Sequence, residues 1–201
     1  MLRIVILLLI INNIVSCSLG GGPAPQDHFY RLPEVKLDGL SESSQVSYKN
    51  IVIKPVKATG LYHERAILFI ESHKPLELQR YHYSFWSSTP AELTHNALYE
   101  GLRSSGIVTH VSRGLSELRP DYIIDTRIIQ FERYIDNSAV NIQLALDISV
   151  RSGHTAGLTW TKRYKVSKTL DSTDMHASAE AFGEAFKEIS TLLVNDLLNK
   201  K

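Results

Sequence analysis

The stretch VNIQLALDISV, residues 140–150, decides the fold of this chain of 201 residues. Aliphatic side chains occupy every even position from Val140 to Val150, and small or polar side chains occupy the odd positions between them. Alternation with a period of two is typical of a β-strand that has one face on the core and one face in water. Antiparallel sheets commonly contain such strands. We therefore expect a long antiparallel strand whose even positions are buried.

The sequence on either side of this strand extends the sheet. Residues 152–157, SGHTAG, are typical of a turn, and the alternation resumes over residues 158–166, which predicts an antiparallel hairpin. Upstream, residues 122–134 are rich in β-branched and aromatic side chains and predict the preceding strand. Shorter apolar runs predict further strands at residues 51–53, 66–70, 76–86 and 107–111.

Two helices are predicted by capping and by apolar periodicity. Thr89 and Glu92 stand at the N-cap and third positions around Pro90, which is the pattern of a capping box. The helix that follows is expected to stop at residues 104–106, and a second, longer helix is expected over residues 175–198. The apolar stripe of the longer helix consists of Phe182, Phe186, Ile189, Leu193 and Leu197.

This order of elements predicts an α+β fold. Short strands precede the first helix, and four strands separate it from the second. We expect a largely antiparallel β-sheet with two helices packed on one face. An aromatic and aliphatic patch at residues 29–32 could add a short strand at the edge of the sheet.

The amino terminus has the layout of a secretory signal. Arg3 precedes an unbroken apolar run over residues 4–11, and small or aliphatic residues lead to Cys17. The run is too short for a membrane span, which needs about 20 apolar residues. Ile14-Val15-Ser16-Cys17 resembles the lipobox of bacterial lipoproteins. The alternative is an ordinary signal peptide followed by a cysteine that is buried by chance.

The lipobox resemblance implies that Cys17 is the lipidation site. Its thiol would be alkylated with diacylglycerol, the signal would be removed before it, and the new amino terminus would be acylated. Several acyl chains hold a protein on a membrane far more firmly than one. The residue after Cys17 is Ser18 and not aspartate, which resembles the signal for sorting to the outer membrane. Cys17 is the sole cysteine, so no internal disulfide is expected.

Composition excludes some classes of partner. Without residues 1–16, which contain Arg3, the chain has 21 basic and 21 acidic side chains. A polybasic protein that binds nucleic acid would differ, so no nucleic acid is expected as a partner. Residues 18–28 are rich in glycine and proline and read as a flexible tether, because they offer little apolar surface to bury.

The motifs of common enzymes are missing. The eight histidines are scattered and form no H-E-x-x-H or cysteine-paired metal pattern, and no G-x-S-x-G is present. Gly20 to Gly22 lack the lysine of a phosphate-binding loop. Asp121 and Asp125 would share a strand face, which solvated strand residues explain more simply than acid–base catalysis. We therefore expect no enzyme activity, no catalytic residue, no cofactor and no metal site.

The order of several short motifs resembles the ABC-type transport auxiliary lipoproteins, the family that includes the paraquat-inducible outer-membrane lipoprotein. The resemblance covers residues 17–198. The matching pieces are the lipobox, Tyr30-x-Leu32, Ile51-Val52-Ile53-x-Pro55-Val56, Tyr81-His82-Tyr83-x-x-Trp86, Leu98-x-x-x-Leu102-x-x-Ser105-Gly106 and Asp121-Tyr122-Ile123-Ile124.

The resemblance implies three segments: a signal peptide at 1–16, a lipidated flexible tether at 17–28 and a single periplasmic ABC-transport auxiliary domain at 29–201. It implies an outer-membrane lipoprotein of a Gram-negative bacterium that faces the periplasm. Acyl chains on Cys17 would contact the membrane, and a mammalian-cell-entry-type protein of an ABC transport system would be the partner in intermembrane lipid transport. Homo-oligomerisation stays open.

Two alternatives to the transport function stay open as well. The first is an envelope assembly lipoprotein that activates a cell-wall synthase or assists secretion, because such proteins also tether a small α+β domain. The second, a periplasmic hydrolase, is disfavoured by the absence of its motifs.

Overall fold

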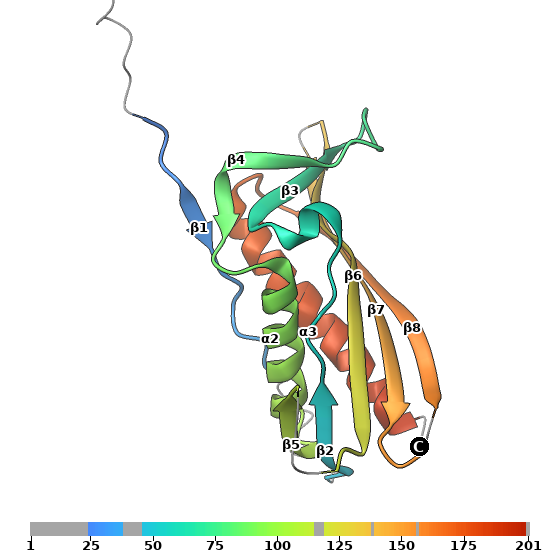
Figure 1. Cartoon of the computed structure of the whole chain (residues 1–201). Coiled ribbons are helices and arrows are strands. Elements are labelled where there is room, and N and C mark those ends of the chain that lie inside the picture. Colours follow the sequence, from blue (N-terminus) through green and yellow to red (C-terminus); the bar gives the residue numbers. More distant parts are fainter. Residues whose placement is uncertain (1–23, 38–45, 115–118, 138, 156, 200–201) are drawn as a thin grey trace, which may run out of the picture.

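A computed structural model describes residues 24–37, 46–114, 119–137, 139–155 and 157–199. Its described part is an α+β domain in which two helices cover one side of a sheet of eight strands (Figure 1). The predicted fold class is therefore confirmed. In chain order the elements are β1 (His28–Tyr30), β2 (Tyr48–Ile53), η2 (Gly60–His63), β3 (Ala66–Glu71), β4 (Gln79–Trp86), α2 (Pro90–Ser104), β5 (Val108–Arg113), β6 (Tyr122–Asp136), β7 (Ala139–Ser152), β8 (Leu158–Leu170) and α3 (Met175–Asn199).

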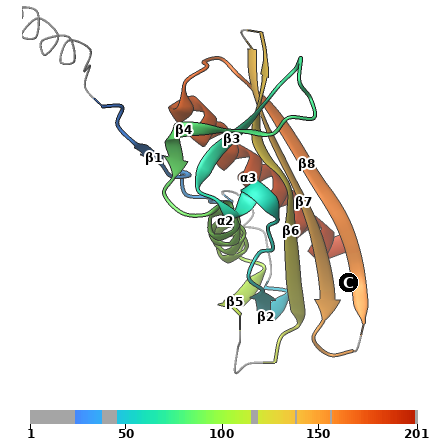
Figure 2. The same cartoon turned by 45° about the horizontal axis from the view of Figure 1, so that its top comes forward.

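The strands β6, β7 and β8 form a long antiparallel meander that curves across α3 (Figure 2). As the sequence predicts, the even-numbered side chains of β7 from Val140 to Val150 are buried, with 0 to 3% of their surface exposed. Ala145 departs from the expected pattern, because it lies on the opposite face and is nevertheless buried. Its register partners are Gln130 and Lys165, and their long side chains can cover a single methyl group.

The other edge of β6 is shared by two strands. Its amino-terminal end pairs in parallel with β2, where Ile51 lies opposite Tyr122, and its carboxyl-terminal end pairs in parallel with β3, where Phe69 lies opposite Arg133. The sheet is therefore mixed, although its longest pairings are antiparallel. Strand β5 extends the sheet beyond β2, and β4 and β1 extend it beyond β3.

Two strand predictions need comment. The patch at residues 29–32 does contain an edge strand, since β1 pairs with β4 alone. The strand expected over 76–86 begins only at Gln79. Backbone hydrogen bonds from Lys74 to Glu71 and from Glu77 to Lys74 close two successive turns before it, and the Leu76 side chain is fully exposed.

Helix α2 begins as its sequence predicts. The Thr89 side chain accepts a hydrogen bond from the Glu92 backbone N–H, and the Glu92 carboxylate accepts one from the Thr89 backbone N–H, so the capping box is complete. Farther along, α2 crosses α3 at a point where a Cβ added to Gly101 would lie 2.5 Å from the Ser190 Oγ. Only a residue without a side chain allows this approach.

A cluster of aromatic rings joins the helices to the sheet. Trp86 at the end of β4, Phe131 in β6, and Phe182 and Phe186 in α3 are each at most 1% exposed. The Trp86 ring meets those of Phe131 and Phe182 edge to face, with centroids 5.5 Å apart in both pairs. Edge-to-face pairs of this kind stabilise a fold beyond the burial of their apolar surface. One continuous core thus runs beneath both helices.

Candidate functional site

The predicted lipidation site, Cys17, lies outside the described residues. The first described element after it is β1, which begins at His28, one residue before the expected domain boundary at 29. Ten residues separate Cys17 from His28. The chain that follows Cys17 therefore enters the described domain at β1, an edge strand of the sheet. None of the described helices is long and apolar enough to span a membrane.

Asp121 has a structural role. Its Oδ2 accepts hydrogen bonds from the backbone N–H groups of Lys49, at 2.6 Å, and Asn50, at 2.9 Å, and so holds the start of β2 against β6. Partial burial acts to raise its pKa, but these hydrogen bonds and the contact with His154 outweigh it and lower the pKa. A carboxylate held in its ionised form in this way is a poor proton acceptor.

Asp125 is neutralised by two cations. Its carboxylate lies 2.9 Å from the Lys57 Nζ and 3.2 Å from the Arg151 Nη2. Burial acts to raise its pKa, and the Lys57 hydrogen bond and charge lower it by more. Each of the two aspartates thus has its own partners in the protein, and neither is the solvated strand residue that the sequence suggested.

The segment from Ser152 to Thr155 brings a serine and a histidine close to Asp121. The His154 Nε2 lies 3.2 Å from the Asp121 Oδ1. The Ser152 Oγ, however, accepts the backbone N–H of His154 at 3.1 Å and that of Thr155 at 3.2 Å. Nucleophilic catalysis needs a hydrogen bond from the hydroxyl to the base. The arrangement found here stabilises the turn.

The described residues contain no group of three or more histidine, cysteine or acidic side chains that could hold a metal ion. His95 of α2 lies with its Nε2 3.3 Å from the carbonyl oxygen of Ile53. His73 and His176 each contact a glutamate.

Two buried charged residues follow each other in β6, and sequence patterns did not single them out. Glu132 is 2% exposed, and its Oε2 accepts hydrogen bonds from the Tyr62 hydroxyl at 2.7 Å and the Phe131 backbone N–H at 2.6 Å. Burial raises the pKa of Glu132, and the hydrogen bonds only partly offset it. Burial raises the pKa of Tyr62, and the neighbouring Glu132 carboxylate raises it further.

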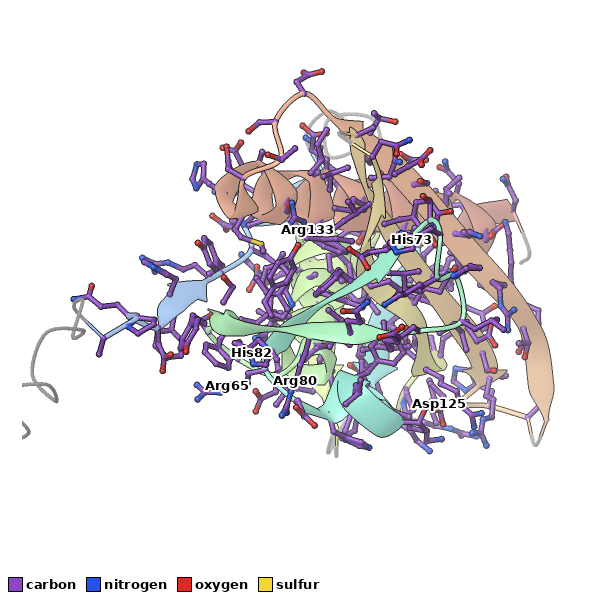
Figure 3. The ribbon with its side chains drawn as sticks, turned by 90° about the horizontal axis from the view of Figure 1, so that it is seen from above. Arg65, His73, Arg80, His82, Asp125 and Arg133 are labelled. Carbon is purple, nitrogen blue, oxygen red and sulfur yellow. The ribbon has the colours of Figure 1, made fainter. Side chains whose placement is uncertain are left out.

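Arg133 is 3% exposed and lies near the start of α3 (Figure 3). Its guanidinium donates to the Tyr81 hydroxyl at 2.6 Å and to the Thr173 carbonyl oxygen, and it contacts the Met175 Sδ at 3.3 Å. The Tyr81 ring lies 5.3 Å from the guanidinium carbon. These contacts tie the β8–α3 connection to β4 and β6.

The outer face of the meander contains an open charged groove with a volume of about 440 Å³. Lys57, Arg127 and Arg151 line it together with Asp125 and Asp147, and Asp147 accepts two hydrogen bonds from the Arg163 guanidinium at 2.6 and 2.7 Å. The Arg163 hydrogen bond lowers the pKa of Asp147, and burial, which acts to raise it, has the smaller effect. The paired charges suit polar contacts and leave no activated nucleophile.

A second cavity, of about 500 Å³, lies between the segment after β2 and helix α2. Pro55, Val56, Ala91 and His95 contribute to its walls. Its lining mixes these apolar groups with the Glu92 carboxylate and the Asn96 amide. Together these observations define the class: a small α+β domain whose described residues contain no recognisable catalytic constellation.

The comparisons with known proteins identify the family. Residues 30–194 match the model of the ABC-type transport auxiliary lipoprotein component, and the chain belongs to this family. The resemblance noted in the sequence is thereby confirmed. No curated protein sequence matches the chain.

Two solved structures illustrate the fold. A protein of Xanthomonas campestris is 21% identical, with a TM-score of 0.73 over 86% of this chain and 96% of its own. A hypothetical protein of Chlamydia trachomatis is 13% identical, with a TM-score of 0.51 over 74% of this chain and 95% of its own. At these identities the likeness concerns the fold alone.

Proposed function

We propose that this chain is an outer-membrane-anchored periplasmic lipoprotein and an accessory component of an ABC, mammalian-cell-entry-type system for intermembrane lipid transport. The observation that carries the proposal is the family match over residues 30–194 directly downstream of Ile14-Val15-Ser16-Cys17. The family description links the chain to ABC-type transport. The lipobox supplies the means of anchoring it to a membrane.

In this proposal residues 1–16 are removed as a signal peptide, Cys17 carries the acyl chains, and residues 18–28 tether the domain. The domain acts by binding and not by catalysis. The contacts of the candidate catalytic groups support this view, because Asp121 binds the β2 backbone and His154, and Asp125 is paired with Lys57. Ser18 supports sorting to the outer membrane, which would place the domain opposite an inner-membrane transporter.

Labelling and capture test the proposal together. Cells that express the wild-type chain or Cys17→Ser are grown with radiolabelled palmitate, since serine offers no thiol to alkylate. We expect label in the wild type alone, found in the outer-membrane fraction. Crosslinking of the wild type in cells should then capture a mammalian-cell-entry-type protein. Capture of a cell-wall synthase in its place would support the envelope assembly function, and label in Cys17→Ser would refute the lipobox.

A further inference from the structure

The edge formed by β1 and β4 exposes aromatic rings. Phe29 and Phe85 are register partners whose rings stack with centroids 5.6 Å apart. Phe29 is 55% exposed and Tyr83, also on β4, is 48% exposed. Among the described residues these are the two large aromatic side chains that stand out as exposed, and both lie on this pair of strands.

Basic side chains lie beside the exposed Phe29 ring and along β4. The Arg65 guanidinium carbon lies 5.5 Å from the centroid of the Phe29 ring, and no ion pair engages Arg65 within the described residues. Arg80 is paired with Glu64 at 2.9 Å, and His82 is exposed. Figure 3 shows Arg65, Arg80 and His82 on the same side of β4, with Arg133 on the other side.

A pocket lies among these groups. Its volume is about 320 Å³, and its walls include Arg65, Arg80, His82, Tyr81 and Phe85. Glu64 is the one carboxylate in the lining, and Arg80 already neutralises it. An anion that entered the pocket would therefore meet the Arg65 charge without a competing acid, and guanidinium groups bind phosphate oxygens well.

This combination is the chemistry of a membrane surface. Tyrosine is enriched at the depth of lipid headgroups, because its ring is apolar and its hydroxyl is polar. Phenylalanine supplies apolar surface to segments that lie at this boundary. Cations beside them are attracted by anionic lipid. We define the aromatic edge as Phe29, Tyr83 and Phe85 with Arg65 and His82.

The path of the chain indicates that the membrane is the partner of the aromatic edge. The ten residues between Cys17 and His28 reach at most about 35 Å when fully extended. No other strand or helix lies nearer to Cys17 along the described sequence. Phe29 thus lies on the element that acyl chains on Cys17 would hold nearest the bilayer, and Phe85 and Arg65 lie against its ring.

We propose that the aromatic edge binds the phosphate headgroups of phospholipids in the membrane that anchors Cys17, with Arg65 at the phosphate and Phe29 at the boundary with the acyl chains. This inference rests on the proposed lipoprotein function and adds a contact surface to it. It also orients the domain, because the edge at β1 and β4 then faces the membrane and the meander of β6 to β8 stays available to a periplasmic partner.

Site-specific photocrosslinking tests the inference. The mature lipoprotein is reconstituted in vesicles of phosphatidylethanolamine and phosphatidylglycerol with p-benzoylphenylalanine in place of Phe29. The matched control carries the probe in place of Leu192, which is 40% exposed on α3. We expect a phospholipid adduct, identified by mass, for the probe at Phe29 and a much weaker one at Leu192. Equal lipid adducts at the two positions, or an adduct to protein at Phe29, would overturn the inference.

A charge variant adds a second measurement. Arg65→Gln should lower the yield of lipid adduct at Phe29 about fivefold, because one cation beside an anionic membrane contributes a factor of that size. Arg127→Gln, an exposed position of the charged groove, is the control and should leave the yield unchanged. Equal yields in wild type and Arg65→Gln would contradict the role of Arg65. The mass of the amino-terminal peptide from the same digest reports acylation of Cys17, so a failure of the proposed lipoprotein function is seen separately.

Discussion

The rings of Phe131 in β6 and Phe182 in α3 stack face to face, with centroids 4.6 Å apart and planes inclined by 8°. Both side chains are at most 1% exposed, and Trp86 closes the pair from β4. This contact joins the middle of the sheet to the carboxyl-terminal helix. It is therefore a point at which packing of α3 on the sheet can be tested.

Phe182→Ala should lower the free energy of unfolding by about 3–5 kcal/mol, which is typical when a buried phenylalanine is truncated and a cavity remains. Leu192→Ala in the same helix should cost about 1 kcal/mol or less, because Leu192 is 40% exposed. Urea unfolding followed by circular dichroism measures both. Similar midpoints for the two variants would contradict the packing of α3 described here.

A buried charge tests the face assignment of β7. Leu144 is 0% exposed, so Leu144→Asp places an unpaired carboxylate in the core and should cost several kcal/mol. Asn141→Asp is the matched control, since its Oδ1 already accepts a hydrogen bond from the Thr169 hydroxyl at 2.7 Å and an aspartate can do the same. Thermal unfolding should show a large decrease for the first variant and little change for the second.

The sequence predicted this strand well because its pattern is local. Burial of alternate residues from Val140 to Val150 needs only a period of two, and the capping box of α2 needs only the four residues from Thr89 to Glu92. The family could also be recognised, because short motifs keep their order along the chain.

Long-range relationships could not be read in this way. No local pattern marks Glu132, which is buried where η2 brings Tyr62 over it from 70 positions away. The division of one edge of β6 between β2 and β3 depends on pairing that no local pattern encodes. The aromatic edge likewise arises only when β1 meets β4, since Phe29 and Phe85 are far apart in the sequence.

The contact between the two helices gives a third prediction. A methyl group at position 101 would overlap Ser190, so Gly101→Ala should destabilise the domain by about 1–3 kcal/mol even though alanine favours a helix. Ser190→Ala should have the opposite sign or no effect, because the buried Ser190 Oγ has no hydrogen-bond partner among the described residues. Unfolding in urea measures both. A stabilising effect of Gly101→Ala would show that α2 and α3 do not approach so closely.

The buried carboxyl group of Glu132 gives a prediction about pH. Its pKa is raised in the folded state by burial, so the folded state holds this proton more tightly than the unfolded chain. The contribution of Glu132 to stability is therefore fully present below its ordinary pKa of 4.5 and is lost as the pH rises through the folded pKa.

Glu132→Gln removes the ionisation and keeps an oxygen that can accept from Tyr62 and the Phe131 backbone. We expect the variant to melt at a higher temperature than wild type at neutral pH, with the difference shrinking as the pH falls towards 4.5. Scanning calorimetry across this range measures the difference. Asp121, Asp125 and Asp147 have lowered pKa values and destabilise both proteins in acid, so the difference between the two curves isolates Glu132. A difference that does not change with pH would contradict the raised pKa.

The last prediction separates the anchor from the domain. A version that lacks Cys17 and carries a cleavable secretory signal should fold, because the core found in the described residues is built from side chains between Tyr30 and Leu198. It should still capture the mammalian-cell-entry-type partner from a periplasmic extract, since a folded surface makes that contact. It should fail to restore envelope integrity in a deletion strain, because a tether of about 35 Å no longer confines it at high local concentration near the membrane. Full rescue by the soluble form would indicate a diffusing carrier. Loss of capture by a form whose far-ultraviolet spectrum shows intact folding would indicate that the partner recognises the acyl chains.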